Sequence, residues 1–364
     1  MTRRMVELGF ATRFAPLALG AVLAGVPAVF AMSGGLIAGV SGDLTLAAAL
    51  AAKPPAGSAA SSTLAPLSPA HLQVLLARAN FSPGLIDGNA GRKTRLAMQQ
   101  FQDARGLEQT ASLDAATQAA LRKAAGREGT AGETWTKPYR ITEADLALIT
   151  GPVPTDWIER SLLELCGYAT LSELLAERGW CSEGLVASLN PGVDLANLIA
   201  GDEVELPDVP DWRGSAAKAS RDAVMTTKVS RLEVDLAERF VKGFDDAGTQ
   251  VMLMHCSIAK SAEKRPVGEL KVKVIATDPD YTFDPKDWPE VADINRKLRI
   301  APGPRNPVGS AWVGLDKPGY GLHGTVRPQD IGKTGSHGCF RLANWDAARL
   351  ARMVKIGTPV SIRE

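Results

Sequence analysis

The sequence predicts a multidomain protein in which a mostly β C-terminal domain follows a small three-helix domain and a small α+β module. Three observations predict this fold class. Stretches rich in Gly, Ala, Pro, Ser and Thr separate segments in which apolar residues recur at regular spacing. The first of these segments has the apolar spacing of helices. The last alternates apolar and polar residues, as half-buried strands do.

Length and composition agree with a folded chain of several domains. The 364 residues suffice for about two or three domains, and 45% hydrophobic with 22% charged residues is typical of globular proteins. The formal net charge is +1, so electrostatics give no reason to expect a nucleic acid partner. The sequence also lacks the known nucleic-acid-binding motifs.

Residues 1–41 have the composition of an export signal. Arginines near the N-terminus precede an uncharged apolar run at 15–41, which is the order of a basic region and a hydrophobic region in a signal. The run is also long enough to span a bilayer, so a cleaved signal peptide and an uncleaved anchor in the inner membrane both stay open. Residues 42–68, rich in Ala, Pro and Ser, are expected to be a flexible linker.

Residues 69–125 predict a small domain of three helices. Three apolar runs have helical spacing, and Pro83-Gly84 ends the first of them. We expect Asp87 and Gly88 to form a tight turn and Thr94 to cap the second helix. The runs carry Leu72, Leu75 and Leu76; Leu96, Phe101 and Leu107; and Leu113, Thr117 and Leu121.

Residues 139–209 predict a small α+β module after a Gly- and Thr-rich linker at 126–138. The stretch 171–178 has the spacing of a helix. A second short helix is expected to end in the turn Asn190-Pro191-Gly192, and a short strand is expected near Leu206. The module would therefore place helices before a closing strand.

Two cysteines, Cys166 and Cys181, lie in this module. In an exported chain they would meet oxidising conditions, so a disulfide between them is one interpretation. Both positions also suit buried apolar thiols, and the sequence leaves the two interpretations open. A polar linker at 210–227 follows.

Residues 228–364 predict the mostly β domain. The stretch 229–236 alternates apolar and polar residues as a half-buried strand does. Most of the helical signal comes late, at 345–354. There we expect Asn344 or Asp346 to cap the helix.

The residues that carry chemistry gather between Tyr320 and Arg341. Half of the four histidines of the chain, His323 and His337, lie here beside one of its four cysteines, Cys339. A thiol becomes a strong nucleophile when an imidazole takes its proton, and the same imidazole can then protonate a leaving amine. Neighbouring glycines would allow a tight turn whose backbone N–H groups face a developing oxyanion. The pattern is typical of acyl transfer.

Other interpretations of Cys339 stay open on these residues alone. A lone cysteine is often a small buried hydrophobic residue, and Cys with His can bind zinc. The zinc interpretation is weakened because His-x-Cys lacks the usual ligand spacing and no fourth ligand is evident. Arg341 would lie on the same side of the strand as Cys339. It would serve there as a cation for a substrate carboxylate or as a structural ion-pair partner.

The sequence His323-Gly324-Thr325 followed by Ser336-His337-Gly338-Cys339-Phe340-Arg341 resembles the signature of the L,D-transpeptidases. These are the peptidoglycan cross-linking enzymes of the YkuD or ErfK/YbiS family. The resemblance extends over about 229–362. Two further segments resemble wall-binding modules: 69–123 is similar to a three-helix peptidoglycan-binding domain, and 139–209 is similar to a degenerate LysM module. The resemblance implies that the mostly β domain is the catalytic one.

The resemblance also implies a role for each residue of the site. Cys339 would be the nucleophile, His323 its base, and His337 a second imidazole that supports the thiolate or the oxyanion. The Gly324 carbonyl would orient His323. The backbone of Gly338 and Cys339 would form the oxyanion hole.

Substrates and partners follow from the same resemblance. Tyr320, Ser336 and Arg341 would bind substrate, and neither a metal nor an organic cofactor would be needed. The substrate would be a peptidoglycan stem peptide, opened after its third residue through a thioester in the periplasm or cell envelope. The acceptor stays open between a stem amine, which gives a 3–3 cross-link, a lysine of an outer-membrane lipoprotein, and water, which gives an L,D-carboxypeptidase.

Two interpretations from other functional classes remain. A wall-binding scaffold with a vestigial catalytic domain would keep the modules without thiol reactivity, and a cysteine peptidase would cut ordinary all-L peptides. The complete set of Cys339, His323 and His337 argues against the scaffold. The wall-binding modules argue against the peptidase.

Overall fold

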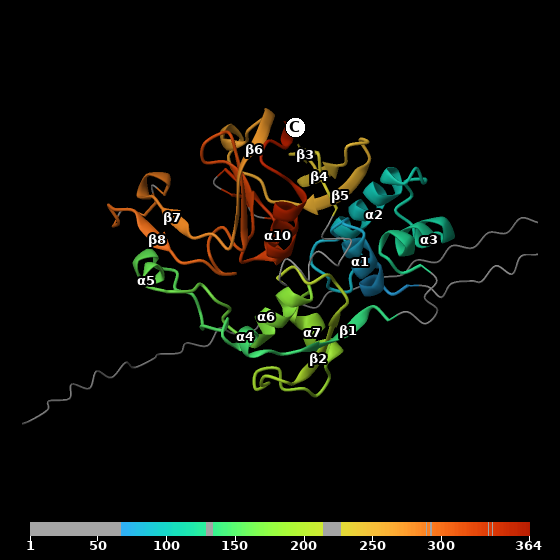
Figure 1. The fold of residues 1–364 in the computed structure, drawn as a ribbon, viewed down its shortest axis with the longest axis horizontal. Coiled ribbons are helices and arrows are strands. Elements are labelled where there is room, and N and C mark those ends of the chain that lie inside the picture. The colour runs from blue at the N-terminus through green and yellow to red at the C-terminus, as the bar shows by residue number, and fades with distance from the viewer. Residues whose placement is uncertain are drawn as a thin grey trace, which may run out of the picture. The chain divides into compact units, whose positions relative to one another are not determined.

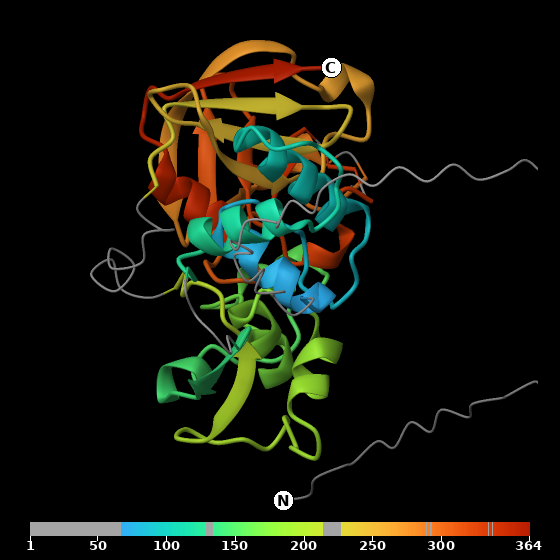
Figure 2. The same ribbon diagram turned by 90° about the vertical axis from the view of Figure 1, so that its right-hand side faces the viewer.

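Figures 1 and 2 show a computed structural model of the chain. The structure describes residues 67–128, 134–213, 227–288, 290–291, 293–333, 335–336 and 338–364. All of them belong to one unit of the fold, Ser62–Glu364. The expected signal or anchor at 1–41 and most of the linker at 42–68 lie outside the described residues. Within the described ranges, no helix is both long and apolar enough to cross a bilayer.

Three helices form the first domain, as the sequence predicts. They are α1 Pro69–Arg78, α2 Arg92–Ala104 and α3 Ala115–Ala124 (Figure 1). Ser68 begins α1, because its side chain accepts a hydrogen bond from the His71 N–H and Pro69 fits the first turn. The apolar faces of the helices share one buried cluster, which includes Leu72, Leu75, Leu76, Phe101 and Leu121.

A buried glutamine organises the turn before α2. The N–H groups of Asp87 and Gly88 donate to Gln73 Oε1, and Gly88 has a φ of 77°, which favours glycine. The expected capping role of Thr94 is wrong, because Gly91 is the N-cap of α2 and no side chain caps it. The Thr94 hydroxyl instead accepts a hydrogen bond from Gln73 Nε2.

The second segment is α+β. Its two strands lie at the start and the end of the segment and pair with each other. Its strands are β1 Thr136–Arg140 and β2 Glu203–Pro207, which are antiparallel. The first strand therefore begins inside the expected linker. The helices between them are α4 Glu143–Leu146, α5 Trp157–Ser161, α6 Leu171–Arg178 and α7 Glu183–Leu189. The predicted helix at 171–178 and the strand near Leu206 are confirmed, whereas the relation to LysM stays a prediction.

Cys166 and Cys181 are both free thiols, so the disulfide interpretation is wrong. Each thiol is buried in a different cluster of apolar side chains. Cys166 lies in the cluster of Phe283, and Cys181 lies in the cluster of Trp180 and Trp345. Burial raises the pKa of both thiols. The two cysteines thus act as small apolar residues.

Residues 228–364 contain the mostly β domain that the sequence predicts. Its main sheet has eight strands in the order β11-β10-β9-β6-β12-β3-β4-β5. Their bounds are β3 Arg231–Asp235, β4 Phe240–Phe244, β5 Gln250–His255, β6 Gly268–Thr277, β9 Ala311–Leu315, β10 Gly321–His323, β11 Phe340–Arg341 and β12 Pro359–Arg363. Short 3₁₀ helices in its loops are η1 Ala262–Lys264, η2 Pro285–Asp287 and η3 Pro328–Asp330. Figure 2 shows β12 at the C-terminus beside β3, to which it is parallel.

One helix, α10 Asn344–Met353, follows β11 and packs on the sheet. Its Leu350 lies in the same buried cluster as the strand side chains. The predicted helix is confirmed, but its predicted cap is wrong. Ala343 is the N-cap and no side chain caps it. The side chains of Asn344 and Asp346 are buried and bond to residues distant in sequence.

A second, smaller sheet of this domain rests on the α+β segment. It consists of β7 Tyr281–Phe283, antiparallel to β8 Leu298–Ile300. Trp157 of α5 stacks on Phe283 with ring centroids 4.5 Å apart, and its ring lies 5.1 Å from that of Trp288. The small sheet is therefore held by an aromatic cluster that belongs to two segments of the chain.

The three segments share buried surfaces as well as linkers. The stretch from Asn80 to Ser82 runs along β5, with the Leu253 N–H donating to Asn80 and the Ser82 N–H donating to Leu253. Trp345 of α10 stacks on Trp180 of the α+β segment, with centroids 6.2 Å apart. Both tryptophans are almost fully buried. The α+β segment is thus docked on the helix that follows β11.

Candidate active site

Strand register places Cys339 and His323 on one face of the main sheet. β10 and β11 are parallel neighbours, with His323 opposite Arg341 and Leu322 opposite Phe340. Side chains alternate along a strand, so Cys339, just before β11, shares the face of Arg341 and His323. Leu322 and Phe340 lie in the core on the other face. The pairing thus brings a thiol and an imidazole from two strands to the same place.

His323 is held as a neutral imidazole in one tautomer. Its Nδ1 lies 2.7 Å from the Gly324 carbonyl oxygen. A carbonyl only accepts, so Nδ1 carries the proton and Nε2 is the basic nitrogen. The imidazole is buried and stacks on Trp312, with centroids 5.6 Å apart. Burial lowers its pKa to about 4; the bond to Gly324 opposes this shift and the Arg341 cation adds to it.

The Cys339 thiol is protonated in the resting site. Its Sγ donates to the Gly319 carbonyl oxygen over 3.2 Å. Burial raises the pKa of the thiol to about 11, although the Gly321 N–H and the Arg341 cation oppose this shift. Cys339 is still partly exposed, so a substrate has access to it. Such a thiol needs a base, and His323 is the imidazole on the same face.

Ser336 fixes the loop before Cys339. Its hydroxyl donates to the Cys339 carbonyl oxygen at 2.5 Å and accepts from the Gly338 N–H at 3.3 Å. Its backbone pairs with the segment after β5, where the Ser336 N–H donates to Ile258 at 2.8 Å and the Lys260 N–H donates to Ser336 at 3.0 Å. Ser336 is buried. Its hydroxyl is therefore committed to the shape of the loop.

Arg341 is tied to the same loop. Its guanidinium donates to the Gly335 carbonyl oxygen, which is a carbonyl rather than the carboxylate of an ion pair. Its backbone N–H and C=O pair with Ser257 at 3.0 and 2.9 Å. The positive charge lowers the pKa of both Cys339 and His323. Arg341 is therefore placed to stabilise a thiolate.

Tyr320 lies over the glycine that precedes the thiol. A Cβ added to Gly338 would be 3.5 Å from the Tyr320 ring, and the Lys317 ammonium lies 4.9 Å from the ring centroid. Tyr320 is partly exposed, so its ring is open to a bound substrate. His337 lies outside the described residues, and its expected role stays a prediction.

Asn344 helps to fix the position of His323, a role that the sequence did not indicate. Its Oδ1 accepts from the Ser310 N–H at 3.1 Å. A Cβ added to Gly309 would lie 2.1 Å from this oxygen, and a Cβ added to Gly324 would lie 2.2 Å from it. The Gly324 carbonyl in turn accepts a hydrogen bond from His323. Asn344 therefore fixes the backbone that orients the imidazole. An asparagine at the start of a helix has the pattern of a cap, which hid this role.

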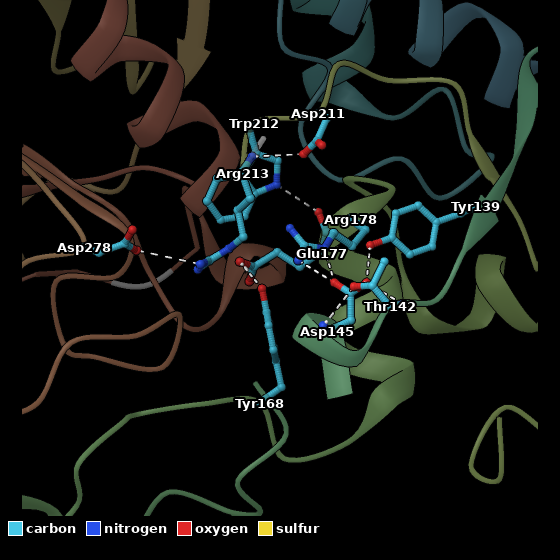
Figure 3. A network of polar contacts seen from close by, with 10 residues as sticks. All are labelled: Tyr139, Thr142, Asp145, Tyr168, Glu177, Arg178, Asp211, Trp212, Arg213 and Asp278. Atoms are coloured by element: carbon cyan, nitrogen blue, oxygen red, sulfur yellow. Dashed lines mark hydrogen bonds and ion pairs between the residues drawn. The ribbon is translucent and has the colours of Figure 1, made fainter. Parts of the chain in front are cut away.

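A buried carboxylate of the α+β segment holds Asn344. Both oxygens of Glu177 on α6 accept from Asn344 Nδ2 at 3.1 Å, and the Tyr168 hydroxyl donates to Glu177 at 2.9 Å. Figure 3 shows Glu177 with Tyr168 and with Arg213, whose guanidinium reaches Asp278 at 3.7 Å. Burial raises the pKa of Glu177, and the Arg213 cation opposes this shift. One acidic residue on an amphipathic helix gives no sequence signal for such a role.

Tyr281 of β7 is a partly buried phenol in the aromatic cluster around Trp157. Its hydroxyl accepts from Trp288 Nε1 at 3.0 Å, and its ring lies 6.0 Å from that of Trp157. Burial raises the pKa of Tyr281, and the negative charge of a Cys339 thiolate contributes in the same direction. A thiolate at Cys339 would therefore disfavour ionisation of this phenol. Its position depends on the docked α5, which local sequence does not reveal.

Comparison with known proteins assigns two regions of the chain. Residues 230–362 match the L,D-transpeptidase catalytic domain called YkuD, and residues 69–121 match a putative peptidoglycan binding domain.

Three putative L,D-transpeptidases are among the similar curated proteins. YqjB of Bacillus subtilis is 35% identical over 111 residues, which cover 29% of this chain and 55% of the relative. YkuD of Bacillus licheniformis is 45% identical over 73 residues, covering 20% and 42%. The chain thus spans about half the length of these two relatives. YkuD of Bacillus subtilis is 28% identical over 193 residues, covering 53% of this chain and 93% of the relative.

Solved structures of L,D-transpeptidases are also similar to this chain. One from Xylanimonas cellulosilytica has a TM-score of 0.31 at 16% identity and covers 82% of this chain and 94% of its own. L,D-transpeptidase 3 from Mycobacterium tuberculosis has a TM-score of 0.29 at 19% identity, covering 36% and 60%. By the two matched families, residues 230–362 are a YkuD L,D-transpeptidase catalytic domain, preceded at 69–121 by a putative peptidoglycan-binding domain.

Proposed function

We propose that the chain is a cysteine-dependent L,D-transpeptidase that acts on peptidoglycan stem peptides. The observation that carries this proposal is the placement of a protonated thiol, Cys339, and a neutral imidazole, His323, on one face of the sheet. The tautomer set by Gly324 leaves Nε2 to take the thiol proton. The catalytic domain and the putative peptidoglycan-binding domain support the same substrate class.

The first half-reaction forms a thioester. Nε2 of His323 takes the proton of Cys339 while the sulfur attacks the carbonyl carbon of the third stem residue. The tetrahedral oxyanion then collapses, the bond to the terminal D-alanine breaks, and the imidazolium gives its proton to the departing amine. This step needs no other reactant.

The oxyanion needs hydrogen-bond donors, and we assign them to the backbone N–H groups of Cys339 and Gly338. At rest the Gly338 N–H makes a long hydrogen bond of 3.3 Å to Ser336 Oγ. A negatively charged oxygen would be the stronger acceptor and would replace it. His337 is assigned the role of a second imidazole beside the oxyanion or thiolate.

The second half-reaction transfers the acyl group. The acceptor gives a proton to His323, attacks the thioester carbonyl and expels the Cys339 thiolate, which then recovers the proton. A stem amine as acceptor gives a 3–3 cross-link, a lipoprotein lysine attaches a protein to the wall, and water makes the protein an L,D-carboxypeptidase. Arg341 stabilises the thiolate, while Tyr320 contacts the stem and Ser336 keeps the loop in shape.

Intact mass measurement tests this function. We expect the purified chain, incubated with a disaccharide-tetrapeptide, to gain the mass of the disaccharide-tripeptide and to release D-alanine. The Cys339→Ala variant should gain nothing. Cross-linked dimer in the supernatant would identify the amine as acceptor, and free disaccharide-tripeptide would identify water. A folded chain with a reactive thiol but no adduct and no turnover would contradict the proposal and favour a wall-binding scaffold.

The substrate places the protein in the cell envelope, and we propose export to the periplasm by residues 1–41. The support is their order of basic and apolar residues. Cell fractionation with N-terminal sequencing would separate the outcomes. A shortened N-terminus in the soluble periplasmic fraction indicates a signal peptide, and an intact one in the membrane fraction indicates an anchor.

A further inference from the structure

A cavity of about 550 Å³, lined by both apolar and charged residues, lies where the three segments of the chain meet. One wall is the turn at 87–89 with the start of α2, a second is Ser182 before α7, and a third comes from the catalytic domain at Arg239 and 329–333. Its volume falls within the range of pockets that bind small molecules, about 300–1,000 Å³. Cys339 is not among its lining residues, so the cavity is separate from the site described above.

The carboxylates at the cavity wall have partners within the protein. Glu238 forms an ion pair with Arg92 at 2.5 Å, and Asp87 accepts two hydrogen bonds within the helical domain. The ion pairs among the described residues include neither Lys93 nor Lys333, although both line the cavity. The cavity therefore offers two ammonium groups to a ligand.

Lys93 extends from α2 towards the catalytic domain. Its Cδ would lie 2.9 Å from a Cβ on Gly84, and its Cε would lie 3.8 Å from a Cβ on Gly332. Lys333 is the next residue. Burial lowers the pKa of Lys93, the positive charge of Lys333 adds to this shift, and nearby carboxylates oppose it. Both lysines thus line the same cavity, and an anion held between their ammonium groups would be attracted to both.

The start of α2 adds positive potential on the same side. The first residues of this 13-residue helix line the cavity. Its N-cap residue is Gly91, which has no side chain to accept a hydrogen bond from the first turn. The N–H groups of the first turn therefore carry the positive end of the helix dipole without a side-chain acceptor. This field strengthens the preference of the two lysines for an anion.

We propose that this cavity is a second binding site for peptidoglycan stem peptides, in which Lys93 and Lys333 together bind a carboxylate of the peptide. The choice of ligand rests on the function proposed above, because a stem peptide combines free carboxylates with a row of amides. Asn89, Ser182 and Gln329 line the cavity and supply amide and hydroxyl groups that pair with such a backbone.

The site is composite, because its two lysines belong to different domains. Arg239 fixes the catalytic wall by donating to the Gly332 carbonyl at 2.6 Å, and the Gly332 N–H donates to Ser257 Oγ at 2.9 Å. Ser257 pairs with Arg341 in the loop of the nucleophile. The helical domain alone supplies only one of the two cations. The site exists only when both domains are in place.

Calorimetric titration of the Cys339→Ala chain with a disaccharide-tetrapeptide tests the site without turnover. We expect replacement of Lys93 and Lys333 by Met to weaken binding at this site about tenfold or more. Replacement of both by Arg should preserve it. Lys273→Met, on an exposed position of β6, is the matched control. Unchanged affinity in the double Met variant, or equally tight binding of a peptide with amidated carboxylates, would overturn the proposal.

Acylation of chains that keep Cys339 separates this proposal from the proposed function. We expect the Lys93→Met, Lys333→Met chain to form the thioester with soluble donor, because neither lysine contacts the thiol. Thioester formation together with lysine-insensitive binding would reject the second site and leave the enzyme standing. Lysine-dependent binding without any thioester would support the second site and contradict the proposed transpeptidase function. Thermal unfolding of each variant within a few degrees of its parent shows that the fold is intact.

Discussion

At the scale of single residues, the site combines two groups that are both uncharged near neutral pH. The pKa of His323 is lowered to about 4 and that of Cys339 is raised to about 11, in both cases chiefly by burial. A preformed thiolate–imidazolium pair would need the opposite order of the two pKa values. In the reaction proposed above, proton transfer to His323 would therefore accompany the attack by Cys339.

The first prediction concerns the pH dependence of acylation. His323 must be neutral to accept a proton, so the rate should fall only as the pH drops through about 4. Arg341→Met removes a cation that lowers both pKa values. The acid limb should therefore move to higher pH, and alkylation of Cys339 by iodoacetamide at fixed pH should slow because less thiolate is present.

Intact mass kinetics across pH measure the limb, and Arg341→Lys is the control because it keeps the charge. An acid limb of the parent chain near the ordinary histidine value of about 6.5 would contradict the assignment. So would an alkylation rate that has already reached its plateau at neutral pH, since that indicates a preformed thiolate.

The second prediction concerns the glycine that orients the base. In Gly324→Ala the new Cβ would lie 2.2 Å from Asn344 Oδ1, so either the Asn344 side chain or the backbone beside His323 must move. We expect acylation to fall by about 10² or more, because catalysis depends on a positioned base. Gly184→Ala on α7 is the control, with the nearest neighbour of its Cβ 4.0 Å away. Its acylation should be unchanged, and equal rates for the two variants would refute the positioning role of Gly324.

At the scale of elements, helices of the α+β segment support parts of the active site that lie in another domain. α6 supplies Glu177, whose carboxylate holds Asn344 behind the histidine. α5 supplies Trp157, on which the small sheet of β7 and β8 rests. The α+β segment therefore helps to hold the structure of the domain at 228–364.

The third prediction tests the contact made by α6. Glu177→Gln turns one acceptor into a donor that faces the Asn344 amide, and we expect the free energy of unfolding to fall by about 1–3 kcal/mol. Acylation should slow as well, although Glu177 lies far along the chain from Cys339. Urea unfolding and a double-mutant cycle with Asn344→Ala measure the coupling. Glu164→Gln, at an exposed carboxylate without this contact, is the control. Additive effects of Glu177→Gln and Asn344→Ala would contradict the coupling between these two residues.

The fourth prediction tests the contact made by α5. Trp157→Ala removes the ring that stacks on Phe283 at 4.5 Å, and since Trp157 is only half-buried we expect a loss of about 2 kcal/mol. The KM for a disaccharide-tetrapeptide should rise while iodoacetamide alkylation of Cys339 stays the same, because the small sheet of β7 and β8 moves and the thiol does not. Ile158→Ala, at a position 43% exposed, is the control. Faster hydrogen exchange in β7 and β8 should accompany the change, and unaltered exchange would disprove the role of α5.

At the scale of the whole molecule, the sequence predicts the elements better than their contacts. The three helices of 69–125 and the long helix after β11 follow from apolar spacing, which depends only on neighbouring residues. Thr94 and Asn344 were expected as caps because capping is a local pattern, yet both side chains bond to residues distant in sequence. The resemblance indicated Cys339 and His323, but not Glu177. Its partner lies in another domain, and no local pattern reports a tertiary neighbour.

The ion pair of Asp346 and Arg349 on α10 shows how the domains depend on one another. Both side chains are buried, with Nη1 of Arg349 3.2 Å from Asp346. Ser82 of the helical domain donates to Asp346 at 2.9 Å. Arg349 also donates to Asn80 and lies over the Trp180 ring at 4.7 Å. A buried ion pair stays favourable only while its remaining hydrogen bonds are satisfied.

The last prediction follows from this junction. A chain shortened to 227–364 keeps the main sheet, Cys339 and the Asp346–Arg349 ion pair. It loses the contacts of that pair with Ser82, Asn80 and Trp180 and uncovers the buried Trp345. Each lost hydrogen bond to a charged group costs about 1.5–3 kcal/mol, and exposed apolar surface adds to this loss. The stability of a whole domain is only about 5–15 kcal/mol. We therefore expect calorimetry to show one cooperative transition for residues 67–364 and a much lower, broader one for 227–364. An unchanged transition in the shortened chain would mean that the catalytic domain folds without the other two segments.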